Sequence, residues 1–234
     1  MAYRLLDLFC KAGGMAAGLA AAGFEVVGVD HKAQPRYPFE FIKADALEVM
    51  SDLDFMSTFD AYHASPPCQV ASAITPSWAR GGHLDLIPDT RLLLMATGKP
   101  YSIENVEGSS LLSSSVWLCG SSFGLRVRRH RGFEVNFPLV APPCDHSWQD
   151  RDPLYRQSRY HRGKEKRWSG VVGVYGRGCG LGMGEKKVWQ DVMEIDWMTM
   201  SELAEAIPPI YGSYVGRRMI RHLIDRERSP VQGS

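Results

Sequence analysis

Residues 3–14, which read YRLLDLFCKAGG, decide the fold predicted for this chain, because an apolar run passes directly into a glycine turn. The run Tyr3–Phe9 is short and mainly apolar, as is typical of a buried strand. The two glycines at the end of the stretch permit a tight turn. Small residues then favour a helix over Met15–Ala22. A strand, a turn and a helix in this order predict the first part of a βα unit.

The same alternation continues through the first half of the chain. Further strands are expected at Glu25–Val29, Phe39–Lys43, Phe59–Ala64 and Tyr101–Ile103, with helices starting at Asp45 and covering Leu86–Thr97. This spacing predicts a parallel, doubly wound α/β sheet. Such sheets bind ligands at the carboxyl ends of their strands. The residues with chemically useful side chains at those ends are Phe9, Asp30, Asp45, Cys68 and Glu104, so the pattern favours an enzyme.

The character of the sequence changes after Glu134, where prolines, basic residues and glycines replace the regular pattern. Helical patterns return at Met200–Ile207, with Ser201 as the expected N-cap, and at Pro209–Arg228. We therefore predict a catalytic domain formed by residues 1–135 and 188–234. Residues 136–187 are predicted to form a small, irregular insert.

Composition limits the class of protein. The 234 residues are 44% hydrophobic and 23% charged, with a net charge of +1, which is ordinary for a globular protein. A charge run is usually a solvated surface, but the presence of two basic clusters shifts the expectation toward a polyanion as partner. They consist of Arg126, Arg128, Arg129, His130 and Arg131, and of Arg156, Arg159, His161, Arg162, Lys164, Lys166 and Arg167.

Five cysteines without close pairing argue against a disulfide framework. The chain opens without a signal-peptide pattern and has no apolar stretch of about 20 residues. A cytoplasmic protein without a membrane partner is expected.

Residues 65–69, SPPCQ, are the most informative stretch for chemistry. Two prolines make the loop rigid and hold Cys68 in a fixed position, which suits a nucleophilic thiol. Glu104 follows a neighbouring strand, where burial can raise the pKa of its carboxyl group. Asp30 is placed to bind a ribose hydroxyl about 20 residues after the glycine turn. A structural cysteine, a solvated glutamate and an ordinary βα turn are the alternatives.

Taken in order, these motifs resemble those of the cytosine-C5 DNA methyltransferases. The matching elements are Asp-Leu-Phe-Cys-x-x-Gly-Gly at residues 7–14, Pro-Pro-Cys-Gln at 66–69, Glu-Asn-Val at 104–106, Arg-x-Arg at 129–131 and Pro-x-x-Tyr-x-x-x-Val-Gly at 208–216. The resemblance implies a Rossmann-like S-adenosylmethionine-dependent methyltransferase sheet with a short target-recognition insert. It also implies a DNA (cytosine-5-)-methyltransferase acting on double-stranded DNA.

The resemblance further implies a mechanism that general chemistry supports. Cys68 adds to C6 of a flipped cytosine, and C5 then attacks the methyl group. Protonated Glu104 hydrogen-bonds N3, while Arg131 and Arg129 contact O2 or a phosphate. The expected cofactor-binding residues are Phe9, Lys11, Gly13, Gly14, Asp30, Asp45, Pro66, Ser213 and Val215. The expected DNA-binding residues are Gln69, Arg156, Arg159, Arg162 and Lys164.

Two residues depart from the family pattern. Val127 stands where a glutamine usually precedes the Arg-x-Arg pair, and Lys11 stands where glycine is usual. Three interpretations of Lys11 remain open: it points to solvent, it pairs with the methionine carboxylate of the donor, or it accommodates a modified donor that carries an extra carboxylate.

No metal site is predicted. Cys144-x-His146 together with His161 and Cys179 is the one alternative considered, but its spacing matches no common zinc pattern. The insert is short, so it is expected to read few bases.

Two other functions remain open at this stage. The first is a tRNA-type RNA cytosine-C5 methyltransferase with the same chemistry, and the second is a catalytically silent DNA-binding protein. The small size suits a solitary, monomeric modification enzyme of phage type, in the cytoplasm of a bacterium or of a phage-infected host cell.

Overall fold

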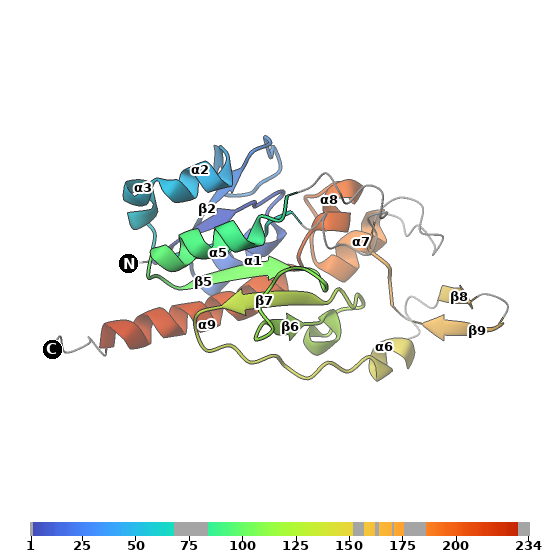
Figure 1. The fold of residues 1–234 in the computed structure, drawn as a ribbon. Coiled ribbons are helices and arrows are strands. Elements are labelled where there is room, and N and C mark those ends of the chain that lie inside the picture. The colour runs from blue at the N-terminus through green and yellow to red at the C-terminus, as the bar shows by residue number, and fades with distance from the viewer. Residues whose placement is uncertain are drawn as a thin grey trace.

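The computed structural model describes residues 2–67, 84–151, 157–161, 164–169, 171–175 and 186–228, of which 157–161 and 164–169 are described as strands only. Figure 1 shows a central sheet with helices on both faces. The strands are β1 (Arg4–Leu8), β2 (Glu25–Asp30), β3 (Glu40–Lys43), β4 (Ala61–Ala64), β5 (Tyr101–Asn105), β6 (Val116–Leu118), β7 (Arg131–Val135), β8 (Gln157–His161) and β9 (Lys164–Ser169). The helices are α1 (Gly14–Ala22), α2 (Ala46–Ser51), α3 (Leu53–Ser57), α5 (Ile87–Ala96), the 3-10 helix η1 (Gly120–Phe123), α6 (Ser147–Arg151), α7 (Lys186–Met193), α8 (Met200–Glu205) and α9 (Pro209–Arg228).

Seven strands form the central sheet in the order β3-β2-β1-β4-β5-β7-β6. The first five strands of this order are parallel to one another, and β7 is antiparallel to both β5 and β6. The reversal of β7 brings its start beside the end of β5, where Asn105 pairs with Gly132. The predicted α/β class with a parallel, doubly wound sheet is confirmed.

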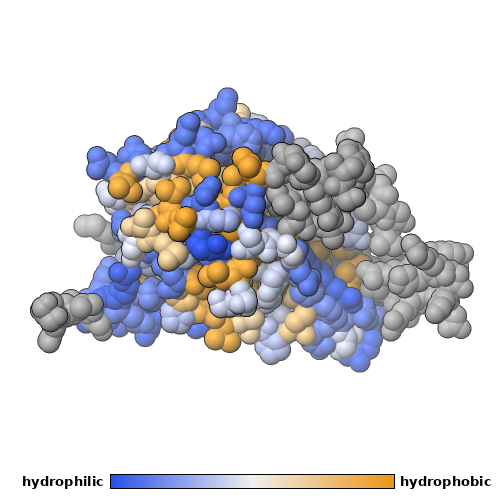
Figure 2. Space-filling view, in the orientation of Figure 1, coloured by the Kyte–Doolittle hydropathy of each residue, from blue (hydrophilic) through white to orange (hydrophobic). Residues whose placement is uncertain are grey.

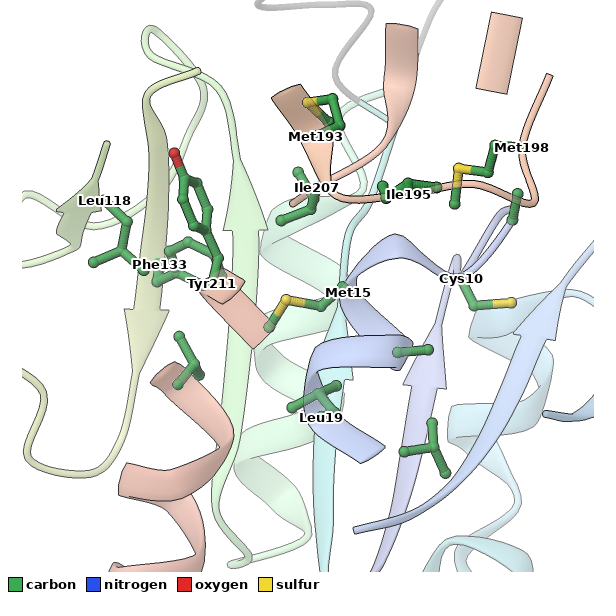
Figure 3. Close-up of a cluster of buried hydrophobic side chains, with 14 of the residues drawn as sticks. Cys10, Met15, Leu19, Leu118, Phe133, Met193, Ile195, Met198, Ile207 and Tyr211 are labelled. Carbon is green, nitrogen blue, oxygen red and sulfur yellow. The ribbon is translucent and has the colours of Figure 1, made fainter. Parts of the chain in front are cut away.

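Each face of the sheet has its own apolar core. On one face, α2, α3 and α5 cover a cluster that includes Leu6, Val29, Met50, Phe59 and Leu94. On the other face, α1 and α9 pack together, and the C-terminal elements join the same cluster. Figure 3 shows Met15 and Leu19 of α1 together with Ile195, Ile207 and Tyr211 in this second core. Segments from both ends of the chain therefore complete one domain.

Sequence patterns located β1 to β5 and the helices α1, α2, α5, α8 and α9, but they missed β6 and β7 of the main sheet and misplaced one helix start. The final helix runs over Pro209–Arg228 as expected. The N-cap of α8 is Thr199 and not Ser201, because Thr199 and Glu202 form a reciprocal capping box. Glu202 also forms an ion pair with Arg36, so the same residue fixes the helix start and the loop after β2.

The predicted insert begins with a long connection after β7. Within the described residues it contains α6 and a two-stranded antiparallel sheet of β8 and β9. Figure 1 shows this hairpin beyond α6, at the edge of the molecule. Helix α7 begins at Lys186, close to residue 188, where the chain was predicted to return to the main domain. It buries Trp189 and Met193 in the core between α1, α9 and the sheet.

The surface is mostly polar on the face that Figure 2 displays, with an apolar area over α5. Leu92 and Met95 of α5 are exposed. Among the described residues, every helix is too short or too polar to cross a membrane.

The contact between α1 and α9 depends on glycine. A Cβ atom on Gly18 would lie 1.8 Å from the carbonyl oxygen of Pro209 and 2.6 Å from the amide nitrogen of Ser213. A Cβ atom on Gly14 would lie 2.4 Å from the carbonyl oxygen of Ile207. These neighbours are backbone atoms that cannot move aside. With any larger residue at Gly14 or Gly18, the two segments could not lie as close together as they do.

We predict that Gly18→Ala destabilises the protein by at least about 2 kcal/mol, the usual cost of overpacking a core. Helix propensity alone would make the same change stabilising by roughly 1 kcal/mol. Urea unfolding measures the difference. Ala21→Gly, at an exposed position of the same helix, is the control and should cost only about 1 kcal/mol. A Gly18→Ala variant as stable as the wild type would contradict the packing described.

Candidate active site

The loop after β1 adopts a strained backbone. Phe9 and Lys11 have φ angles of 58° and 46°, and Gly13 has a φ of 81°. Positive φ is costly for side chains with a Cβ atom, and such strain concentrates at functional sites. Three left-handed residues within five positions turn the chain sharply at the carboxyl edge of the sheet.

Asp30 joins this loop to the end of β2. Its carboxylate is 4% exposed and accepts the backbone N–H groups of Lys11 at 3.1 Å and of Lys32 at 2.9 Å. Nearby, burial raises the pKa of Asp7 to about 8, and Tyr37 donates its hydroxyl hydrogen to this carboxyl group. Asp30 is therefore a buried carboxylate held at this edge by two backbone N–H groups, and His31 Nδ1 lies 3.3 Å from its Oδ1.

Several predicted cofactor-binding residues have protein partners in this structure. Asp45 is the N-cap of α2 and accepts from the N–H groups of Leu47 and Glu48. Gly14 faces the backbone of Ile207. Ser213 accepts hydrogen bonds from Arg217, and Val215 is fully buried in the α1–α9 core.

Lys11 also has a protein partner, since its ammonium group forms an ion pair with Glu205 at the end of α8. Both side chains are more than half exposed, so this pair contributes little to stability. The contact leaves the Lys11 side chain exposed beside the loop. Whether it points to solvent, pairs with the methionine carboxylate or accommodates a modified donor stays a prediction.

Glu104 and Arg131 form the central charged pair of the site. Arg131 Nε lies 3.0 Å from Glu104 Oε1, across the β5–β7 junction. Glu104 is 5% exposed, and burial raises the pKa of its carboxyl group although Arg131, a Ser65 hydrogen bond and Arg129 oppose the rise. A raised pKa makes it easier for the Glu104 carboxyl group to carry a proton, which it could then donate to a neutral acceptor on a ligand.

The proline loop is tied to the same strand end. Asn105 donates its side-chain amide to the carbonyl oxygen of Pro66 at 3.0 Å, and Pro66 is buried. Because Cys68 follows two residues later, this bond fixes the segment that leads to the predicted nucleophile. Cys68 and Gln69 themselves lie outside the described residues.

His63 is a site residue that the sequence motifs did not reveal. Its buried ring lies 2.8 Å from Ser102 Oγ and 3.0 Å from Ser65 Oγ. Burial lowers the pKa of His63 to about 3, so the ring is neutral. When the Ser65 hydroxyl donates to Glu104, its oxygen accepts the Nε2–H of His63, and Nδ1 accepts from Ser102. His63 thus orients the Ser65 hydroxyl, which faces Glu104. This role becomes visible only once the pairing of β4 with β5 is known.

Arg129 is engaged with backbone carbonyls. Its two terminal nitrogens donate to the carbonyl oxygens of Val174 at 2.8 Å and Ala204 at 2.7 Å. Tyr211 donates in turn to the carbonyl oxygen of Arg129. Of the predicted arginine pair, Arg131 is the member beside Glu104, while Arg129 links the start of β7 to the C-terminal half.

The predicted DNA-binding residues fall mainly in the insert. Arg159 lies on β8 and Lys164 on β9, at register positions opposite Arg167 and His161. Arg156 and Arg162 lie outside the described residues. Their contacts with a nucleic acid stay predictions.

Solved structures with the same fold are methyltransferases. An E. coli prophage protein assigned as a DNA modification methyltransferase is 13% identical, with a TM-score of 0.59 over 95% of this chain and 99% of that one. The Dnmt2 methyltransferase of S. pombe is 13% identical, with a TM-score of 0.52 over 99% of both chains. These likenesses define the class of the fold, a Rossmann-like methyltransferase sheet.

A family model matches the N-terminal part of the sequence. Residues 3–109 match the model described as C-5 cytosine-specific DNA methylase. This match confirms the resemblance found in the motifs. No curated protein matches the chain.

The neutral, buried His63 predicts a pH-dependent stability. Its folded-state pKa of about 3 lies below the unfolded value near 6.5, so the unfolded state binds the extra proton as the pH falls between these values. The wild type should therefore lose about 2 kcal/mol more unfolding free energy than His63→Asn when the pH is lowered from 7 to 5. Urea titrations of both proteins at both pH values test this. Equal losses would show that His63 titrates normally in the folded protein.

Proposed function

We propose that this protein transfers a methyl group from S-adenosylmethionine to C5 of a flipped cytosine in double-stranded DNA, through a covalent bond between Cys68 and C6. The observation that carries the proposal is the buried Glu104–Arg131 pair at 3.0 Å, on the strand end that also binds the loop leading to Cys68. The match of residues 3–109 to the cytosine-C5 family model supports the same reaction.

The proposed mechanism assigns each residue a step. The Cys68 thiolate adds to C6 of cytosine, which makes C5 nucleophilic. Glu104 carries a proton and hydrogen-bonds N3, so the ring accepts the added electron pair. Arg131 stays beside Glu104 and stabilises negative charge that develops at O2. C5 takes the methyl group and then loses its proton, and the electron pair of the C5–H bond re-forms the ring and expels Cys68.

The residues at the ends of β1 and β2 fit the methyl donor. The Asp30 carboxylate is suited to ribose hydroxyls, and the half-buried Phe9 ring beside it is suited to adenine. When bound, the donor supplies an electrophilic methyl group. Lys11, at the mouth of the loop, would exchange Glu205 for a carboxylate of the donor.

The decisive experiment combines product mass with a nucleophile variant. The full chain is incubated with S-adenosylmethionine and mixed-sequence duplex DNA, and the nucleosides are weighed after digestion. We expect 5-methylcytosine with the wild type and none with Cys68→Ala. A larger mass increment would point to a modified donor. Modification of RNA but not of DNA would refute the proposed substrate, and modification that survives Cys68→Ala would refute the nucleophile.

The carboxyl group of Glu104 makes a second prediction. Glu104→Ala should lower the rate of methylation by roughly 10²- to 10⁴-fold, the usual contribution of a positioned acid. The matched control is Glu107→Ala, which removes an exposed carboxylate three residues away and should keep the wild-type rate. Single-turnover rates measure both variants, and equal rates for the two would exclude Glu104 from the chemistry.

A covalent trap separates catalysis from silent DNA binding. With S-adenosylmethionine present, duplex DNA that contains 5-fluorocytosine should remain attached to the wild type, because after methyl transfer the fluorine on C5 cannot leave as a proton does and Cys68 is not expelled. Cys68→Ala should bind the same duplex without a denaturation-resistant adduct. If the wild type forms no such adduct, the result would favour a catalytically silent DNA-binding protein.

A further inference from the structure

Four metal-binding side chains from three separate segments meet beside the active site. Cys119 follows β6, His130 precedes β7, and Cys144 and His146 precede α6. One ligand atom from each residue lies within 4.8 Å of all the others. The three segments are distant in sequence, so only the sheet and the long connection after β7 bring them together.

Three sulfur–nitrogen distances in the cluster are close to the edges of a zinc tetrahedron. Cys119 Sγ lies 3.3 Å from His146 Nε2, and Cys144 Sγ lies 3.1 Å from His146 Nε2 and 3.5 Å from His130 Nε2. Zinc bonds of about 2.3 Å to sulfur and 2.0–2.1 Å to nitrogen give sulfur–nitrogen edges of roughly 3.5 Å. A central ion could therefore reach all four atoms with small shifts.

The chemistry of the four groups also suits a metal. Each imidazole has one ring nitrogen with a lone pair to offer, and each cysteine has one sulfur. Two thiolates balance the charge of one divalent ion.

Neighbouring groups support the sulfur atoms as an outer shell would. The Ser121 hydroxyl lies 3.2 Å from Cys119 Sγ and 3.6 Å from Cys144 Sγ, placed to donate to either sulfur. Such outer-shell donors orient ligands and tune a metal site. The cluster thus has a complete set of four protein ligands and a polar support.

We propose that Cys119, His130, Cys144 and His146 bind one zinc ion. With four protein ligands the site is closed, which is the pattern of structural rather than catalytic zinc. This proposal differs from the prediction made from the sequence, which was that the chain has no metal site. It shares only Cys144 and His146 with the alternative considered there.

The metal would hold the catalytic edge and the root of the insert together. His130 stands between Arg129 and Arg131, so a bond to zinc fixes the backbone from which Arg131 reaches Glu104. Cys144 and His146 immediately precede α6, which leads into the insert. Zinc therefore acts here as a positioning element for Arg131 and does not touch the reacting atoms.

Metal content tests the proposal without any methylation assay, so its outcome is independent of the proposed function. The full chain is purified under reducing conditions and dialysed against metal-free buffer. Elemental mass spectrometry should then find about one zinc ion per chain. Cys144→Ser and His146→Ala should lose most of it. Cys10→Ser and His222→Gln, which change the same residue types elsewhere, should keep it.

Cobalt provides a second measurement on folded protein. The wild type loaded with Co²⁺ should display the intense visible bands of tetrahedral coordination and a thiolate charge-transfer band. Cys144→His keeps four ligands, so it should retain the tetrahedral bands with weaker charge transfer. Wild-type protein without zinc and with only octahedral cobalt bands would overturn the proposal. So would a disulfide between Cys119 and Cys144 in protein purified under reducing conditions.

Discussion

The close backbone contact between α1 and α9 is the constraint on which the rest of the structure depends. Gly14 and Gly18 let the segment around Ile207 and Pro209 lie directly against the first helix. Because α1 also fixes the loop after β1, the C-terminal helix completes the edge where Asp30 and Phe9 lie. The chain can therefore leave the sheet after β7, form an irregular excursion, and still return to one core. A bulkier residue at Gly18 would weaken the core and the site together.

Much of the fold was accessible from the sequence, because local patterns determine it. Short apolar runs located the parallel strands, and the boundaries of α9 were predicted to the residue. The motif order identified the cytosine-C5 family and with it Glu104 and Arg131, which the structure brings to 3.0 Å. The capping residue of α8 was wrong, since Ser201 and Thr199 have similar propensities and only the reciprocal contact with Glu202 distinguishes them.

The remaining features depend on contacts between distant residues, which a single sequence does not display. His63 became visible only when the β4–β5 register placed it between Ser65 and Ser102. Arg129 belongs to the predicted Arg-x-Arg motif, yet its terminal nitrogens donate to carbonyl groups of two C-terminal segments. The proposed zinc ligands have no recognisable spacing, because the sheet assembles them from three segments. Local pattern thus predicts strands and motifs, while side-chain partners require the folded chain.

The two ends of the insert are anchored against the same short segment before β7. On the outgoing side, Gln149 donates to the carbonyl oxygen of Leu125, and on the returning side Val172 donates to the carbonyl oxygen of Arg126. A peripheral element whose entry and exit lie side by side can change in length or be exchanged without moving the sheet. The insert could therefore diverge in evolution, or be replaced by grafting, while the central sheet keeps its structure.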